Sequence, residues 1–420
     1  MKFKEFYENN ILLEALNIGD SMEGVFCIVV ALQMAYGYVT KEMVQEARRD
    51  ADISGTKEVI IDTNVKDNPA FDNIVSDPND ILQVRVKLNL RQANVKGMFG
   101  PNLTSHPVID SHIQTLIDKV GNISAIDKIQ RFMISVLTNK KPDEVIFYVV
   151  ADGVGGSTSG GKIKGDITIK IEAKTKTDIP NDLEVPISFS LKVDSDLVSN
   201  LGIFSGILKL GQLFELEMIK GLETLDLFPN QNAKMRELLY DHQDQWDNDS
   251  HIIYYLRQYM VVQDKFMAVP DEEYEGGVAQ RKLQQAQSEI EQLKLLIERF
   301  LDEFESQIES EDYEQFTTDP RARLFTSRVL RFLEKELFGE DLADIIRISK
   351  GDIQELNQAN LDELKNDHVI NFKKDGSTMK FFTVDINNEQ KLLFQIRPRV
   401  EYNQKKNIKT QQFSVELGDL

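Results

Sequence analysis

The sequence has a single cysteine, Cys27, and only five histidines, which are scattered along its 420 residues. A lone cysteine excludes an internal disulfide, so the chain fits a reducing compartment such as the cytoplasm. One cysteine with scattered histidines also gives no support to a zinc cluster or to a Cys/His catalytic pair. The chemistry that remains open depends on carboxylates, lysines, arginines and hydroxyl groups.

Long hydrophobic runs are also missing. The first eight residues lack an uninterrupted apolar stretch and a small-residue cleavage site, so they do not resemble a secretory signal. The most apolar early segment, Val25 to Met34, is too short to span a bilayer and is expected to form a buried helix. We therefore expect no membrane contact and a cytoplasmic location.

Positive charge is in deficit, because 49 Lys and Arg stand against 69 Asp and Glu and give a net charge of −20. Affinity for duplex DNA comes largely from cations that neutralise phosphates, so this balance argues against a protein that coats DNA. Residues 369–410 differ, with nine Lys or Arg and four Asp or Glu. This local excess predicts a nucleic-acid contact at Arg397, Arg399, Lys405 and Lys406, and a solvated basic face is the alternative.

The segment from Lys164 to Asp194 alternates apolar and polar residues in two runs. Apolar residues occupy positions 167, 169 and 171 in the first run, and positions 185, 187, 189, 191 and 193 in the second. Such alternation predicts two strands, each with one buried face. A turn at 178–181 would set Asp166 roughly opposite Lys192 and Thr168 opposite Ser190. The polar face of this hairpin would carry Asp166, Glu172, Ser190, Lys192 and Asp194.

An aspartate that faces a lysine across two strands has the chemistry for metal-dependent cleavage of a phosphodiester. Carboxylates hold a hard cation such as Mg²⁺ or Mn²⁺, which lowers the pKa of a bound water and neutralises charge on the scissile phosphate. A nearby lysine orients the nucleophile or stabilises the transition state. The hairpin is therefore the candidate active site, with Mg²⁺ or Mn²⁺ as its expected cofactor.

Three features of this region resemble the PD-(D/E)XK restriction-endonuclease-like superfamily, in particular its divergent phage members. They are Gly165-Asp166, then Ser190-Leu191-Lys192 on the next strand, then a helix-forming segment at about 197–216. The apolar run 144–152 before the hairpin adds a third strand and gives the order helix, three strands, helix of that superfamily. The resemblance implies that Asp166 binds the metal and that Lys192 is the motif lysine. Gly165 stands where the motif has Pro, and Ser190 stands where it has Glu or Asp.

Two other carboxylates are candidate metal ligands. The superfamily often places a Glu on the helix before the sheet, and Glu23 would then supply the carboxylate that Ser190 lacks. The simpler interpretation of Glu23 is a capping box with Asp20, in a helix that ends at Gly37. Glu172 could join Asp166, and Glu172-Ala-Lys174 preceded by Asp152 also offers a version of the motif shifted by one strand.

The organisation predicted from these patterns is an α+β protein, with a restriction-endonuclease-like core and a largely helical insertion. The expected domains are a core at 1–215, the insertion at 216–365, and a β-rich segment at 366–420 that returns to the core with a strand pair at 380–385 and 391–399. In the insertion, apolar residues step by three and four as in a coiled coil, which predicts a helix of at least five turns packed on a helix of the same chain or of a second copy. This seam consists of Leu283, Ala286, Ile290, Leu293, Ile297, Phe300 and Phe304.

The expected function is metal-dependent cleavage of DNA, and the resemblance to phage members implies a phage-encoded protein that acts in the host cytoplasm. The alternative is a catalytically inactive protein of the same fold, which binds DNA or assembles with protein partners through its helical part.

Overall fold

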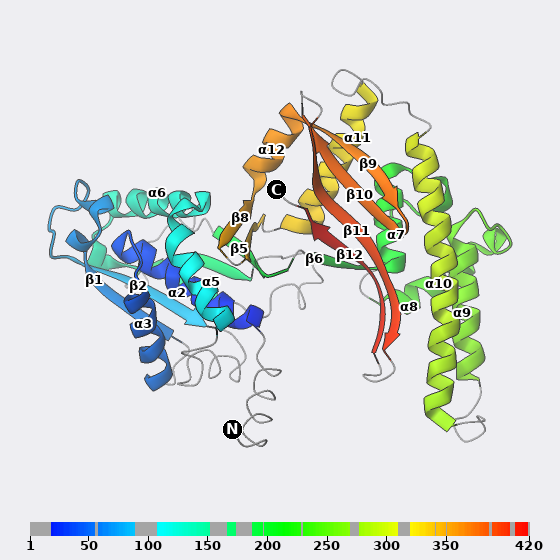
Figure 1. Ribbon diagram of the computed structural model, residues 1–420, viewed down its shortest axis with the longest axis horizontal. Helices are drawn as coiled ribbons and strands as arrows, with labels where there is room; N and C mark the ends of the chain where they lie inside the picture. The colour runs from blue at the N-terminus through cyan, green and yellow to red at the C-terminus, as the bar shows by residue number, and fades with distance from the viewer. Residues whose placement is uncertain are drawn as a thin grey trace. The chain divides into compact units, whose positions relative to one another are not determined.

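The computed structural model divides into two compact units, and each is built around its own sheet (Figure 1). The first unit combines Met1–Ser195 with Leu337–Gln358, and the second combines Asp196–Glu336 with Ala359–Leu420. Both units mix helices and strands, as expected for an α+β protein. The structure describes residues 18–54, 58–88, 107–151, 166–173, 187–195, 197–227, 230–268, 277–309, 320–340, 342–349, 351–385, 389–403 and 408–418.

The first unit contains a sheet of seven strands in the order β1-β2-β3-β4-β5-β7-β8. The pairs β2/β3 and β5/β7 are parallel and the other neighbours are antiparallel. The strands are β1 (Glu58–Asn64), β2 (Ile81–Leu88), β3 (Val145–Ala151), β4 (Ile167–Ala173), β5 (Ile187–Val193), β7 (Asp344–Ser349) and β8 (Asp352–Leu356). The three strands predicted in succession, β3, β4 and β5, are neighbours in this sheet.

Four helices cover one face of this sheet, where they share a single hydrophobic core with it (Figure 1). They are α2 (Ile18–Tyr36), α3 (Lys41–Ser54), α5 (Pro107–Lys119) and α6 (Ser124–Asn139). The predicted buried helix is confirmed, because every residue from Val25 to Met34 of α2 is buried. No single described helix has the length and apolar character needed to cross a membrane, and α2 and α3 would pass that test only as a pair bent by 119°.

The predicted C-terminal end of this helix is confirmed, and its predicted N-terminal end is wrong. Gly37 has a φ of +74° and its amide donates to the carbonyl of Gln33, as a glycine that ends a helix does. Helix α2 already includes Ile18, however, so Asp20 lies inside it. The capping-box interpretation of Glu23 is therefore wrong, because a capping residue must stand at the helix boundary.

The hairpin of β4 and β5 forms as predicted, with a register that differs by two residues. Ile167 pairs with Phe189 and Thr168 pairs with Ser188, and the amide of Asp166 donates to the carbonyl of Phe189. Asp166 therefore lies opposite the Ser190 end of β5 and not opposite Lys192. A shift of two residues keeps every side chain on its expected face, whereas a shift of one would have reversed them.

The second unit has an antiparallel sheet of five strands in the order β6-β12-β11-β10-β9. Its strands are β6 (Leu197–Gly202), β9 (Val369–Asp375), β10 (Thr378–Val384), β11 (Gln390–Asn403) and β12 (Ile408–Leu417). The expected strand pair at 380–385 and 391–399 is confirmed as β10 and β11. The helix expected at 197–216 is only partly right, because β6 precedes α7 (Ile203–Phe214).

The long helix α10 (Gly277–Glu309) confirms the predicted seam. Five of its seven seam residues are buried and the other two, Leu283 and Ile290, are partly buried. The helix packs against α9 of the same chain and against the sheet, where Phe300 meets Phe413 and Phe304 meets Phe372 (Figure 1). The other helices are α8 (Gln231–Asp241), α9 (Ile252–Met267), α11 (Pro320–Leu333) and α12 (Gln358–Asp367), and a π-helical turn at Glu334–Phe338 follows α11.

The units divide the chain differently from the expected domains. Strands β9 to β12 form their own sheet with β6 instead of joining the first sheet. The strands that do return to the first sheet are β7 and β8, from within the expected helical insertion. Strands β7 and β8 have six and five residues, which is too short for a hydrophobic period that separates a strand from a helix, so the elements they pack against decide their conformation.

Candidate functional site

Asp166, Ser190 and Lys192 meet on the face of the first sheet that lies opposite the four helices. Along β5, Phe189 and Leu191 belong to the hydrophobic core that the sheet shares with these helices. Successive side chains of a strand point to opposite faces, so Ser190 and Lys192 project from the other side. Asp166, just before β4, reaches the same side and contacts both residues. This is the face that the sequence assigned to them.

One carboxylate oxygen is the centre of this cluster. Oδ2 of Asp166 accepts a hydrogen bond from Ser190 Oγ at 3.2 Å and another from the Leu191 amide at 3.1 Å. Lys192 Nζ lies 3.7 Å from the same oxygen. The side chains of Lys192 and Asp166 are 22% and 20% exposed, so the pair is largely sheltered from water.

Burial raises the pKa of Asp166 above its ordinary value, and this effect outweighs Lys192, the Leu191 amide and the Ser190 hydroxyl, which all lower it. The groups around Asp166 therefore do not fully compensate its negative charge. An additional cation next to the carboxylate would lower this pKa, because an opposite charge favours the ionised form.

Glu23 does not contact Asp166 in the described part of the chain. It lies on α2, which covers the opposite face of the sheet. Its charge acts on Cys27, whose pKa is raised first by burial and then by Glu23. The carboxylate that Ser190 lacks is therefore not supplied by Glu23 in this arrangement.

The backbone of Glu172 lies too far from that of Asp166 for the two residues to share an ion. Both residues belong to one extended segment, because β4 runs from Ile167 to Ala173 without a break. Six residues of strand span about 20 Å, whereas two ligands of one Mg²⁺ each lie about 2 Å from the ion. The alternative motif cannot be placed, since Asp152 and Lys174 lie outside the described residues.

The donor set fits a divalent cation only as a site with one carboxylate. Within the described ranges, no group of three or more His, Cys, Asp or Glu could hold a metal ion. Asp166 and the Ser190 hydroxyl would provide the protein oxygens. Mg²⁺ commonly keeps several waters and is held by one or two carboxylates together with substrate phosphates, so this set is at the low end of what it accepts.

Asp194 does not join the cluster, although the sequence placed it on the same face. It has a φ of +46°, which ends the alternation of β5, and its carboxylate lies 2.7 Å from Nε2 of His112 on α5. His112 is almost fully buried. This pair could not be predicted from the sequence, because its members are 82 positions apart and no motif links them.

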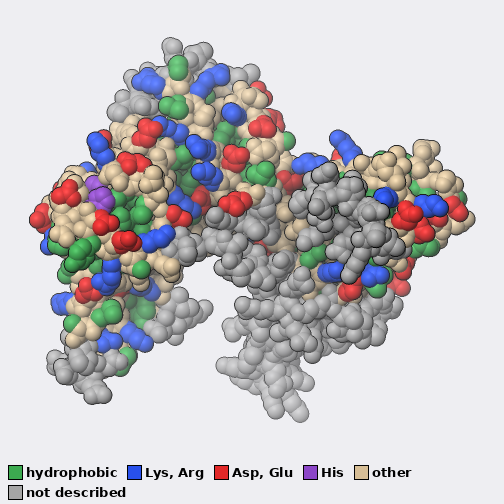
Figure 2. Space-filling view, turned by 180° about the vertical axis from the view of Figure 1, so that it is seen from behind, with side chains coloured by type: hydrophobic (Ala, Val, Ile, Leu, Met, Phe, Trp, Pro, Cys, Tyr) green, Lys and Arg blue, Asp and Glu red, His purple; other side chains and the backbone are tan. Residues whose placement is uncertain are grey.

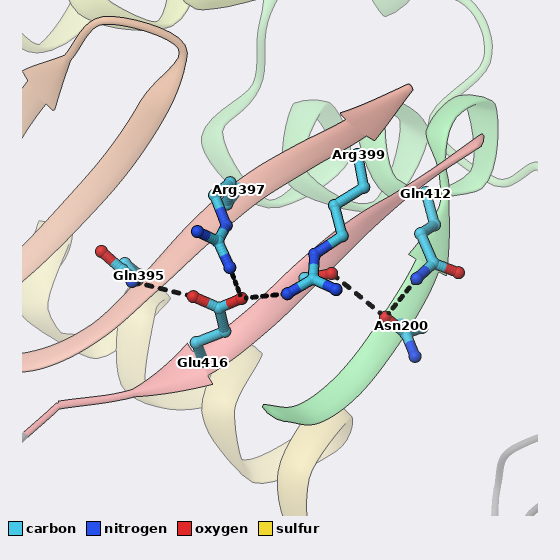
Figure 3. A network of polar contacts seen from close by, with 7 residues as sticks. Asn200, Gln395, Arg397, Arg399, Gln412 and Glu416 are labelled. Atoms are coloured by element: carbon cyan, nitrogen blue, oxygen red, sulfur yellow. Dashed lines mark hydrogen bonds and ion pairs between the residues drawn. The ribbon is translucent and has the colours of Figure 1, made fainter. Parts of the chain in front are cut away.

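The second unit contains the predicted nucleic-acid contacts Arg397 and Arg399, which share one carboxylate (Figure 3). Glu416 Oε1 lies 2.5 Å from Arg397 Nη2 and 3.1 Å from Arg399 Nη2, and Gln395 donates to Oε2 at 2.8 Å. The two arginine side chains are 45% and 40% exposed, so each keeps donors available to solvent. Lys405 and Lys406 lie outside the described residues.

On the face shown in Figure 2, basic and acidic side chains of the described residues are interspersed and do not form one large field of a single sign. Any anionic partner would therefore be bound by local groups such as the arginine pair rather than by the overall charge, which is −20.

Searches for similar family models, curated proteins and solved structures find no match to this chain.

Proposed function

We propose that the chain cleaves DNA phosphodiesters with the help of a divalent cation, in a restriction-endonuclease-like core, at the site formed by Asp166, Ser190 and Lys192. The observation that carries the proposal is the convergence of these three side chains from adjacent strands on one face of the sheet. The incompletely compensated charge of Asp166 supports it, because a carboxylate in that state favours binding of a cation.

Each residue has a role in this proposal. Asp166 holds the cation, which supplies charge neutralisation and an activated water when bound. The Ser190 hydroxyl orients the carboxylate by donating to Oδ2. Lys192 contributes a positive charge close to where a phosphate would lie. Arg397 and Arg399 bind the DNA backbone, since half-exposed guanidinium groups suit phosphate oxygens.

The test is Asp166→Asn, which removes the carboxylate charge and keeps the size of the side chain. Cleavage of single- and double-stranded DNA with Mg²⁺ or Mn²⁺ should fall by about 100-fold or more, the usual scale for loss of a group that stabilises the transition state. Lys192→Ala should be severely impaired and Ser190→Ala less so.

Asp375→Asn is the matched control, because Asp375 is an exposed aspartate that pairs with Lys380 at 2.6 Å in the second unit. It should leave cleavage unchanged. Wild-type cleavage that survives Asp166→Asn would refute this assignment of the site.

The alternative function, a catalytically silent binding or assembly protein, is favoured by one observation. The second carboxylate of the motif is replaced by Ser190. In the described part of the chain Glu23 does not contact Asp166, and the backbone of Glu172 lies six residues along the strand from it. Wild-type protein that cleaves no DNA with either cation, yet binds DNA equally well in the presence of a chelator, would establish this alternative.

A further inference from the structure

The second unit contains a pocket of about 350 Å³ between α7, the segment after it, and the end of α11. Its size falls in the range of small-molecule sites, which begin at about 300 Å³. Leu213, Leu225 and Phe332 contribute apolar surface to its lining. One wall is fixed by Gln212, whose side-chain amide donates to the carbonyls of Leu222 and Leu225 at 3.3 and 2.8 Å.

Charged groups line the rest of the pocket. Lys209 Nζ lies 2.7 Å from Oε1 of Glu336, whose side chain is only 11% exposed, so these two charges largely neutralise each other. The remaining lining charges are Asp226, Arg331 and Lys335. The pocket therefore has one positive charge in excess, in a chain whose net charge is −20.

Arg331 lies in the last turn of α11, and Lys335 lies four positions later in the π-helical turn that follows. Side chains four positions apart on a helix lie close together, and two like charges there repel each other. Among the described residues, neither Arg331 nor Lys335 forms an ion pair. Both side chains are exposed at the pocket, so an anion placed between them would relieve their repulsion.

The backbone at this place is unusual as well. Lys335 and Glu336 belong to the π-helical turn at 334–338. Such turns are rare and are found frequently at functional sites. The turn contributes both a cation and the partner of Lys209 to the pocket lining.

We propose that this pocket binds a phosphate-bearing small molecule with a flat apolar body, the chemistry of a nucleoside monophosphate. The phosphate contacts Arg331 and Lys335, and the base packs against Phe332, Leu213 and Leu225. The proposal uses residues of the second unit alone, so it stands or fails independently of DNA cleavage at Asp166.

The test is titration calorimetry of the full chain with adenosine monophosphate, adenosine and inorganic phosphate. Adenosine monophosphate should bind at least tenfold more tightly than either of the other two. The double variant Arg331→Ala/Lys335→Ala should weaken its binding at least tenfold, and Leu213→Trp, which fills the pocket, should abolish it.

A matched control is Arg323→Ala/Lys365→Ala, which removes two cations from a different pocket of about 310 Å³ in the same unit. It should bind adenosine monophosphate as the wild type does. No binding of adenosine monophosphate at millimolar concentration, or equal weakening in the control and in Arg331→Ala/Lys335→Ala, would overturn the proposal.

Discussion

Two carboxylates, Asp166 in the first unit and Glu416 in the second, accept hydrogen bonds from an adjacent strand in different ways. Asp166 has one cation 3.7 Å away, together with a hydroxyl and a backbone amide. Glu416 is more deeply buried, at 7% exposure, and has two arginines and the Gln395 amide within 3.1 Å (Figure 3). Asp166 is thus short of positive charge, whereas Glu416 has it in excess.

This difference separates two uses of a buried carboxylate. A carboxylate short of positive charge can gain from an added cation, and this suits the chemistry proposed for Asp166. A carboxylate held by two arginines instead fixes the orientation of their guanidinium groups. Glu416 therefore holds Arg397 and Arg399 in place, which suits the contact with DNA phosphates proposed for them.

The largest expected effect tests whether the hydrophobic cores that support Asp166 and Glu416 unfold independently of each other. Phe189 and Phe413 are both fully buried, next to Phe26 and Phe300 respectively. Replacing either by Ala should cost about 3–5 kcal/mol of the free energy of unfolding. The only tryptophan, Trp246, lies in the second unit, so its fluorescence reports that unit alone.

We therefore expect Phe413→Ala to shift the fluorescence transition in denaturant, and Phe189→Ala to shift circular dichroism without moving the fluorescence midpoint. Equal movement of both signals by Phe189→Ala would mean that the units unfold as one.

A smaller effect is expected from Glu416→Ala, which removes the common partner of both arginines. The loss of hydrogen bonds to a buried charged group should cost about 1–3 kcal/mol, measured from the fluorescence midpoint in denaturant. Glu416→Gln keeps the shape and part of the hydrogen bonding, so it should cost less. An unchanged midpoint in Glu416→Ala would show that the network adds nothing to stability.

The smallest effects are pH-dependent and have opposite signs in the two units. The pKa of Asp166 is raised from 3.8, mainly by burial, so the folded state binds the proton more tightly than the unfolded state. Its contribution to stability therefore falls as the pH rises from about 3.8 through the raised value. Asp166→Asn should lack this fall, and should gain on the wild type as the pH rises.

For the exposed Asp375, the Lys380 ammonium lowers the pKa from 3.8, so the stabilising contribution is present above that value and is lost as the pH falls through the lowered one. The deficit of Asp375→Asn relative to the wild type should therefore vanish in acid. Denaturant midpoints of both variants between pH 3 and pH 7 test these slopes, and slopes of the same sign would contradict the comparison.

The sequence predicts which residues of the candidate site share a face of the sheet. It does not predict which of them lie opposite one another. Alternation in β4 and β5 fixes which residues share a face, and Asp166, Ser190 and Lys192 follow it. The register could not be predicted, because the composition of residues 174–186 does not determine where the first strand ends and the second begins. Asp166 therefore lies opposite the Ser190 end of β5, two positions from the expected residue, yet Lys192 still comes within 3.7 Å of it.

The contact between the two arginines and Glu416 was easier to predict from the sequence. Strands β11 and β12 form a hairpin in which Asn403 pairs with Ile408, and continuing this register sets Gln395 opposite Glu416. A turn at 404–407 would have predicted the contact. Strand β7 could not be predicted in this way, because a short apolar run acquires its conformation from β5, a partner far away in the sequence.

The parallel pairing of β5 with β7 also sets the order in which the protein can fold during its synthesis. Strand β5 ends at Val193, and the strand that completes its edge begins only at Asp344. Between these two strands the ribosome makes nearly all the helices of the second unit. The sheet of that unit can form only after β9 to β12 have been made. The nascent chain therefore holds two incomplete sheets at once, each with an open edge that another chain could pair with. The first sheet is complete once β8 has emerged, and the second is complete only once β12 has followed.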